Sequence, residues 1–134
     1  MASEDANMTW TIALERIDPP QDPAALADVH PLLERLVKAF GPRPLARLLD
    51  VRPGSVANWT SGHRQISTEM ARRIINLHDI LTRALQVFAP ATAARWLVGN
   101  EPFLDNKRPI DVLVLRGAAP VIEALDNIDA GAYP

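Results

Sequence analysis

The sequence has no cysteine, few aromatic residues and no long apolar run. Without cysteine, a disulfide framework, a thiolate metal site and a cysteine nucleophile are all excluded, and a reducing compartment is compatible with the composition. No apolar stretch approaches the roughly 20 residues that a membrane-spanning helix needs. The N-terminus also lacks the charged, apolar and small-residue pattern of a secretory signal. We therefore expect a cytoplasmic protein that does not enter a membrane.

Groups that carry catalysis are also scarce. The three histidines, His30, His63 and His78, are far apart in the sequence, and none has a second ligand at a spacing typical of metal sites. No nucleophile stands beside a base in a recognisable motif. We therefore expect no enzymatic activity, no catalytic residue, no metal and no cofactor.

Apolar residues make up 48% of the 134 positions, enough to form one domain or two small helical lobes that share a core. Their spacing predicts an all-α fold. The longest predicted helix follows a cap at Ser67 and carries apolar residues at every third or fourth position: Met70, Ile74, Leu77, Leu81, Leu85 and Phe88. This stripe fits either an internal core helix or a dimer seam. We expect Arg72, Arg73 and Arg83 on or near its solvent side.

Prolines predict where several other helices begin, because proline is favoured at the first helical position. Pro31 begins a helix with an apolar face that ends at Gly41, and Pro90, Pro109 and Pro120 begin three short helices in the tail. The tail is expected to bury Ile110, Leu113, Val121, Ile122, Leu125 and Ile128. At the other end, Asp22 and Pro23 predict a helix start. Residues 1–21 read as a mobile arm, or as an edge strand over the alternating Trp10, Ile12 and Leu14.

Residues 44–62 (PLARLLDVRPGSVANWTSG) predict two short helices joined by a tight turn. Asp50 tolerates a left-handed backbone, Pro53 presets φ for the second helix, and Gly62 ends it. This pattern is typical of a helix-turn-helix. It resembles the Xre-like helix-turn-helix proteins at Leu45, Ala46, Leu49, Val51, Val56, Trp59 and Gly62. Arg52 stands where that family usually carries a serine N-cap.

The net charge of −2 is unevenly distributed along the chain. Residues 41–85 hold seven basic and three acidic side chains, a charge of +4, whereas residues 1–40 carry −4 and residues 86–134 carry −2. Positive charge on the helix-turn-helix favours DNA binding. The candidate DNA contacts are Arg52, Ser55, Ala57, Asn58, Ser61, Arg64 and Gln65. Asn58 suits adenine, and Arg52, Arg64 and Gln65 suit the phosphate backbone. Alternatively, these side chains are solvated on a fold that kept the motif without its activity.

The tail carries a second pattern, at Trp96, Leu97, Asn100, Leu104, Pro109, Ile110, Asp111, Val112, Leu113, Gly117, Val121, Leu125, Ile128, Gly131 and Tyr133. This pattern resembles the toxin-binding domain of Xre/MbcA/ParS-type antitoxins. Asp105, Asn106 and Lys107 replace glycines that are often found between Leu104 and Pro109 in that family.

This resemblance implies a cognate RES-type toxin that consumes NAD or transfers ADP-ribose, and whose active site the C-terminal segment blocks. It also implies repression of the antitoxin's own operon, with operator DNA, a homodimer and a larger toxin–antitoxin hetero-oligomer as further partners. The candidate toxin contacts are Trp96, Asn100, Lys107, Arg108, Asp129, Gly131, Ala132, Tyr133 and Pro134.

Together these observations divide the chain into an arm over residues 1–21, a helix-turn-helix domain over residues 22–89 and a toxin-binding domain over residues 90–134. Two other functions remain open. One is a plain transcriptional repressor whose tail dimerises or senses a ligand. The other is an inhibitor without a DNA function, in which the helix-turn-helix serves only as a scaffold or an oligomerisation surface.

Overall fold

The structure is a computed structural model that describes residues 28–132. The predicted arm over residues 1–21, the predicted helix start at Asp22 and Pro23, and the predicted toxin contacts Tyr133 and Pro134 lie outside the described residues. Within residues 28–132 the chain forms α-helices, one short 3-10 helix and no strand, so the predicted all-α class is confirmed. The helices are α2 (His30–Phe40), α3 (Pro42–Leu48), α4 (Pro53–Ser61), α5 (Thr68–Val87), α6 (Pro90–Val98), η2 (Pro102–Leu104), α7 (Pro109–Arg116) and α8 (Ala119–Asp129).

Proline and glycine set most of the helix boundaries, as the sequence predicts. Pro53, Pro90 and Pro109 each stand at the start of a helix. Gly41 and Gly117, which end α2 and α7, have φ angles of 84° and 87°, values that L side chains rarely adopt. The cap of α5 is also as predicted, because the Ser67 hydroxyl accepts a hydrogen bond from the Met70 amide at 3.1 Å.

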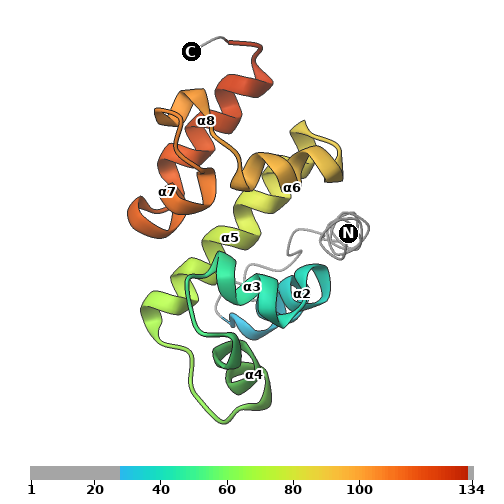
Figure 1. Ribbon diagram of the computed structural model, residues 1–134, viewed down its shortest axis with the longest axis vertical. Helices are drawn as coiled ribbons and strands as arrows, with labels where there is room; N and C mark the ends of the chain where they lie inside the picture. Colours follow the sequence, from blue (N-terminus) through green and yellow to red (C-terminus); the bar gives the residue numbers. More distant parts are fainter. Residues whose placement is uncertain (1–27, 133–134) are drawn as a thin grey trace.

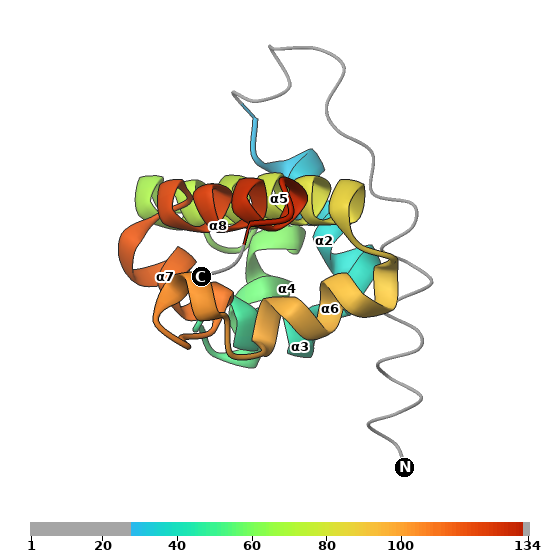
Figure 2. The same ribbon diagram turned by 90° about the horizontal axis from the view of Figure 1, so that it is seen from above.

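The long helix α5 runs through the middle of the molecule and packs against elements from both halves of the chain (Figure 1). From the first half of the chain, α2 contacts α5. From the tail, α6, α7 and α8 contact it. Seen from above, α8 overlaps α5 in one layer, and α6 and α7 lie together in a second layer beside them (Figure 2). One helix therefore organises both halves of the fold.

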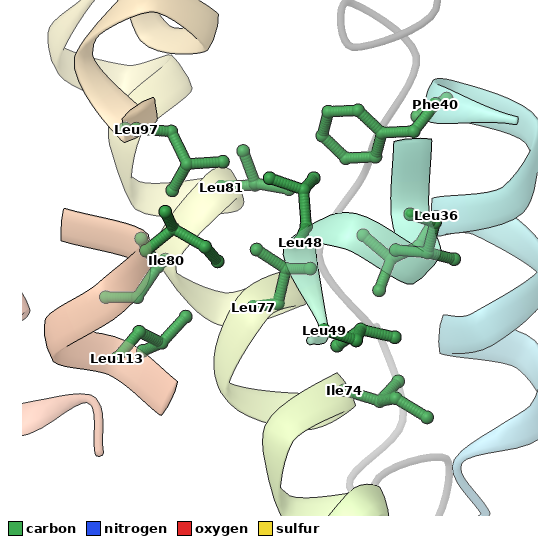
Figure 3. Close-up of a cluster of buried hydrophobic side chains, with 14 of the residues drawn as sticks. Leu36, Phe40, Leu48, Leu49, Ile74, Leu77, Ile80, Leu81, Leu97 and Leu113 are labelled. Atoms are coloured by element: carbon green, nitrogen blue, oxygen red, sulfur yellow. The ribbon is translucent and has the colours of Figure 1, made fainter. Parts of the chain in front are cut away.

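The buried side chains form one continuous cluster around α5. Figure 3 shows Ile74, Leu77, Ile80 and Leu81 of α5 between side chains of α2 and α3 and side chains of α6 and α7. Ile74, Leu77 and Leu81 are completely buried within the chain, so the predicted stripe serves the internal core and these three positions are not a dimer seam. In the tail, Ile122 and Ile128 are only partly buried, whereas Val112, which was not predicted to face inward, is buried.

Candidate functional site

The helix-turn-helix is built by α3, α4 and the turn between them. Asp50 adopts the predicted left-handed conformation, with φ of 57°, and the Val51 amide reaches back to the Ala46 carbonyl at 2.9 Å. Arg52 is the N-cap residue of α4, and its side chain makes no capping hydrogen bond, as expected for an arginine in place of serine. Val56 and Trp59 are buried against α2 and α3, which fixes which face of α4 points outward.

Most of the predicted DNA contacts lie on that outward face or just after it. Arg52, Ala57 and Asn58 are exposed, and Arg64 and Gln65 are exposed in the connector that follows α4. Ser55 is only partly buried. The Arg64 amide donates to the Asn58 carbonyl at 3.2 Å, which holds the connector against the end of the helix. The structure therefore brings these residues together at one end of the molecule (Figure 1).

Ser61 lies beside them, but its hydroxyl is already engaged within the chain. The oxygen lies 2.6 Å from Nδ1 of His63 and 3.3 Å from the Asn58 carbonyl, to which it donates. A hydroxyl bonded in this way is less available to a phosphate, so Ser61 also has a local role in ending α4. The sequence signal for this role is the order Ser61, Gly62, His63. The glycine ends the helix, and the serine hydroxyl and the histidine ring lie on either side of it, close enough to form a hydrogen bond.

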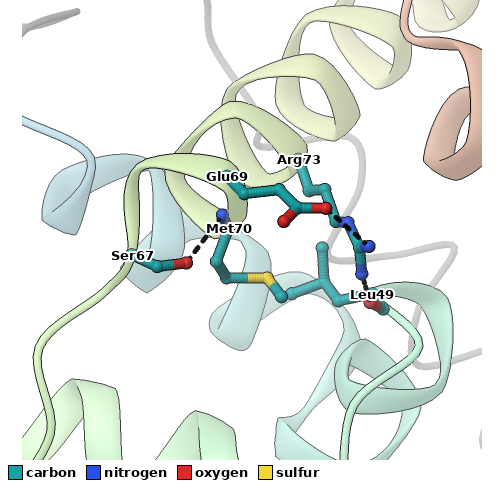
Figure 4. A network of polar contacts seen from close by, with 5 residues as sticks. All are labelled: Leu49, Ser67, Glu69, Met70 and Arg73. Carbon is teal, nitrogen blue, oxygen red and sulfur yellow. Dashed lines mark hydrogen bonds and ion pairs between the residues drawn. The ribbon is translucent and has the colours of Figure 1, made fainter.

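The helix-turn-helix is attached to α5 through Arg73, which corrects the expectation that this side chain faces solvent. Its side chain is only 24% exposed, and its guanidinium donates to the Leu49 carbonyl at 3.1 Å and to the Glu69 carboxylate at 3.2 Å (Figure 4). The Leu49 carbonyl lies at the C-terminal end of α3, where intrahelical donors run out. Arg73 thus fixes the orientation of α3 relative to α5. Arg72 remains exposed, as do Arg43 and Arg47 on α3.

Trp96 is a predicted toxin contact that the structure places in an internal interaction. Its indole Nε1 donates to Oε2 of Glu101 at 2.6 Å, and its ring lies against Phe88 with ring centroids 5.7 Å apart. Glu101 is 5% exposed, and its other carboxylate oxygen accepts from the Phe103 amide at 3.1 Å. Trp96 is therefore tied to the fold, and Glu101 is the buried partner that sequence reasoning missed.

The backbone around Glu101 forms a closed loop over residues 101–107. Glu101 and Lys107 pair as an isolated antiparallel bridge, and the Glu101 carbonyl accepts from the Asn106 amide at 2.9 Å. Asp105 and Asn106 have φ angles of 57° and 63°. These residues replace the glycines of the resembling family, yet they adopt the left-handed conformation that glycine favours, as aspartate and asparagine tolerate best.

Three further predicted toxin contacts, Asn100, Lys107 and Arg108, line one depression of about 400 Å³ beside α7. Arg108 forms a double hydrogen bond to Asp111, at 2.8 and 2.9 Å. This bond from Arg108 lowers the pKa of the Asp111 carboxyl below its usual value and raises the pKa of Arg108. Lys107 and Arg116 leave the depression with an excess of positive charge.

The predicted contacts Asp129, Gly131 and Ala132 are exposed at the end of α8. Gly131 has φ of 73°, and the Ala132 amide donates to the Asn127 carbonyl at 3.0 Å, which turns the chain at the helix end. This end of α8 and the outward face of α4 lie at opposite ends of the molecule (Figure 1). The structure thus separates the predicted DNA contacts from the predicted C-terminal toxin contacts.

The histidines occupy three separate environments: His30 begins α2, His63 follows α4, and His78 lies buried in α5. Burial lowers the pKa of His78, the charge of Arg35 lowers it further, and Asp79 opposes both effects. Over residues 28–132 no three His, Cys, Asp or Glu side chains are grouped so that they could hold a metal ion. Within the same residues no helix combines the length and apolar character needed to cross a membrane.

Comparisons with known proteins give one informative match. No protein-family model matches the sequence, and no solved structure matches it either. The chain is 27% identical over 99 residues to the probable mycobacterial cidal antitoxin Rv3188 of Mycobacterium tuberculosis, and the match covers 72% of this chain and 84% of that protein. This chain is similar to an antitoxin. The similarity supports an antitoxin family, in agreement with the broader part of the sequence interpretation.

A match that covers 72% of 134 residues has to include α3, α4 and α5, wherever in the chain it begins. The similarity to the antitoxin therefore includes the helix-turn-helix and the long helix on which both halves are packed. It is not confined to the tail, where the more specific resemblance was found.

Proposed function

We propose that this chain is an antitoxin of the Xre/MbcA/ParS type, which neutralises a RES-type toxin and represses its own operon. The observation that carries the proposal is the similarity over 99 residues to a mycobacterial cidal antitoxin. The narrower assignment rests on the order of the two resemblances, with a helix-turn-helix first and a toxin-binding tail after it. We propose a binding protein of the cytoplasm, without catalysis or a cofactor of its own.

For neutralisation, we propose that the C-terminal segment enters the active site of the toxin, an enzyme that consumes NAD or transfers ADP-ribose. Asp129, Gly131 and Ala132 are exposed, and the positive φ of Gly131 turns the chain away from the axis of α8. Tyr133 then supplies an aromatic face and a hydroxyl, a combination that is enriched in tight contacts. A segment of this kind can fill a cleft while the helical body stays outside it.

For repression, we propose that α4 enters the major groove of operator DNA. Its outward face carries Asn58, which can form two hydrogen bonds with adenine, and Arg52 and Arg64 are exposed beside it for phosphate contacts. The cationic residues of α3 are also exposed, so the local field favours an approaching duplex. Since the two surfaces lie at opposite ends of the molecule, one chain has room for both partners.

The proposal is tested by deleting residues 131–134 and measuring NAD consumption by the proposed cognate toxin. Within the described residues the deletion removes the exposed Gly131 and Ala132 and the two backbone hydrogen bonds that their amides donate, to Ile128 and Asn127, so the fold and operator binding should survive. Neutralisation should be lost. The matched control is Asp126→Asn, an exposed change on α8 that leaves the C-terminal segment intact.

Three outcomes separate the proposal from its alternatives. A full-length chain that never inhibits the toxin but binds its upstream DNA is a plain repressor. A chain that inhibits the toxin but binds no upstream DNA is an inhibitor with a helix-turn-helix scaffold. A truncated chain that still silences the toxin refutes the terminal segment as the inhibitory element.

A further inference from the structure

Arg73 joins α5 to the turn of the helix-turn-helix through two different nitrogens of one guanidinium. Nη1 donates to the Leu49 carbonyl at 3.1 Å, and Nη2 donates to Oε1 of Glu69, one turn earlier on α5, at 3.2 Å (Figure 4). Leu49 directly precedes Asp50, whose left-handed backbone lies in the turn that leads into α4. Arg73 therefore holds the turn from which α4 starts as well as the end of α3.

This bond differs in kind from the apolar packing around it. Figure 3 shows Leu48 and Leu49 packed close to Ile74 and Leu77 of α5. Over residues 28–132 no second hydrogen bond joins α5 to residues 42–62. Hydrophobic burial is non-directional, so it holds helices together without selecting one orientation. A hydrogen bond is directional, and a planar guanidinium with two donors engaged has little freedom left, so Arg73 fixes the angle between the helix-turn-helix and α5.

The proposed DNA contacts lie on elements that this bond links. Asn58 lies on α4, the exposed Arg47 lies on α3, and Gln65 lies in the connector that leads to the cap of α5. Phosphate contacts set the register of a protein on the duplex, and base contacts read the sequence from within that register. If α4 rocked on α5, long cationic side chains would still reach phosphates, but the two aligned hydrogen bonds from Asn58 to a base would be lost.

We propose that Arg73 is a positioning residue for sequence recognition. Through the Leu49 carbonyl it holds α4 at the angle at which Asn58 reads a base, and it does not touch the DNA itself. This inference rests on the proposed operator binding and adds a residue to it. Arg73 is only 24% exposed, and its guanidinium is already engaged twice within the chain. Its loss should therefore lower discrimination between sequences and spare binding to DNA in general.

The first test compares the duplex that the full-length chain selects from a random pool with a scrambled duplex of the same composition. Arg73→Met keeps the apolar stem and removes the donors. It should lower the ratio of the two affinities about tenfold, the scale of one lost base contact, and should leave the salt dependence unchanged. Arg83→Met is the matched control, since it removes the same charge from the same helix and breaks a similar bond, to Asp79. Its ratio should equal that of the parent.

Arg73→Lys separates position from charge. Lysine keeps the charge but lacks the planar fork that reaches two acceptors at once, so it should restore only part of the affinity ratio. A thermal melt verifies that each variant is folded at the temperature of the binding assay. If Arg73 contacted a phosphate instead, Arg73→Met would weaken binding to both duplexes equally and reduce the salt dependence, and Arg73→Lys would restore both. That result would overturn the proposal.

The absence of cysteine allows the orientation itself to be measured without DNA or toxin. Ala57→Cys on α4 and Gln86→Cys on α5 introduce two exposed thiols for spin labels, and double electron–electron resonance gives the distance between them. The parent and Arg83→Met should give one narrow distribution of distances, and Arg73→Met should give a broader or shifted one. Equal distributions in all three would overturn the positioning role whatever the DNA result.

The outcomes with DNA separate this inference from the proposal on which it rests. A parent that selects no duplex overturns the proposed repression and the role of Arg73 with it. A parent that selects a duplex, together with an Arg73→Met variant of the same affinity ratio, overturns the role of Arg73 alone.

Discussion

The hydrogen bond between Trp96 and Glu101 allows a quantitative test of whether Trp96 supports the fold or contacts a partner. Trp96→Phe keeps an aromatic ring near Phe88 but removes the Nε1 proton that lies 2.6 Å from the Glu101 carboxylate. Glu101 is 5% exposed, so little water can replace the lost donor. A hydrogen bond to a charged group contributes about 1.5–3 kcal/mol, and an unpaired buried group adds to the loss.

We therefore expect Trp96→Phe to lower the free energy of unfolding by about 2 kcal/mol, or to lower Tm by about 8 °C at roughly 4 °C per kcal/mol for a domain of this size. Urea denaturation gives the free energy. Trp59 is buried in the helix-turn-helix and provides a fluorescence signal that the substitution does not remove. Under conditions where the variant is folded, neutralisation of the toxin should be unchanged.

A double-mutant cycle with Glu101→Gln isolates the interaction. Trp96→Phe removes the donor, and Glu101→Gln removes the charge and one of the two acceptor oxygens, so the double variant should lose less than the sum of the single losses by about 1–2 kcal/mol. Additive losses would refute the structural role of this bond. A variant with parental stability but lost neutralisation would return Trp96 to the toxin contacts.

The other predictions concern DNA reading, pH and backbone strain. Asn58→Ala should cost about 1–3 kcal/mol on the preferred operator only, whereas Arg52→Ala should weaken binding to all sequences and reduce its salt dependence, as fluorescence anisotropy would measure. The lowered pKa of His78 means that the unfolded chain binds more protons at this residue than the folded chain does. The contribution of His78 to the free energy of unfolding should therefore be constant above about pH 7 and fall as the pH drops below about 6.5. Urea titrations at several pH values would measure this fall, and His78→Leu should remove it. Asp105→Gly should raise the free energy of unfolding by about 0.5–1 kcal/mol, because φ is 57° there, whereas Asp126→Gly in α8 should lower it by a similar amount.

Most helix boundaries could be predicted from the sequence, because the residues that set them act on the backbone close to their own position. Pro53 and Pro109 begin helices and Gly62 ends one because φ preferences and a missing amide act within a few residues. The stripe on α5 was predictable for a similar reason, since a period near 3.6 places its members on one face whatever the partner is. Whether that face meets its own chain or a second copy depends on long-range packing, and only the structure shows that the core covers it.

The same limit explains the contacts and the burial that sequence reasoning did not predict. Most positions in residues 109–116 are apolar, so the periodicity of apolar residues does not distinguish the buried face from the exposed face. Only the structure shows that Val112 is buried and Leu115 exposed. The helical periodicity of the sequence places Arg73 on the solvent side of α5. Its guanidinium nevertheless donates a hydrogen bond to the Leu49 carbonyl, because α3 ends beside it. Trp96 and Glu101 lie five residues apart and meet only because a loop follows α6. All the predicted DNA and toxin contacts, Trp96 included, stay predictions.

The position of α5 also bears on how the protein is degraded. α5 holds side chains from both halves in one buried cluster, so an opening of this helix exposes apolar surface from both halves at once. A protease that cuts within α5 would then end both proposed activities, operator binding and toxin neutralisation, in a single event. The lifetimes of the two proposed activities in the cell should therefore be equal, and a substitution in α5 that speeds turnover should release the toxin and derepress the operon together.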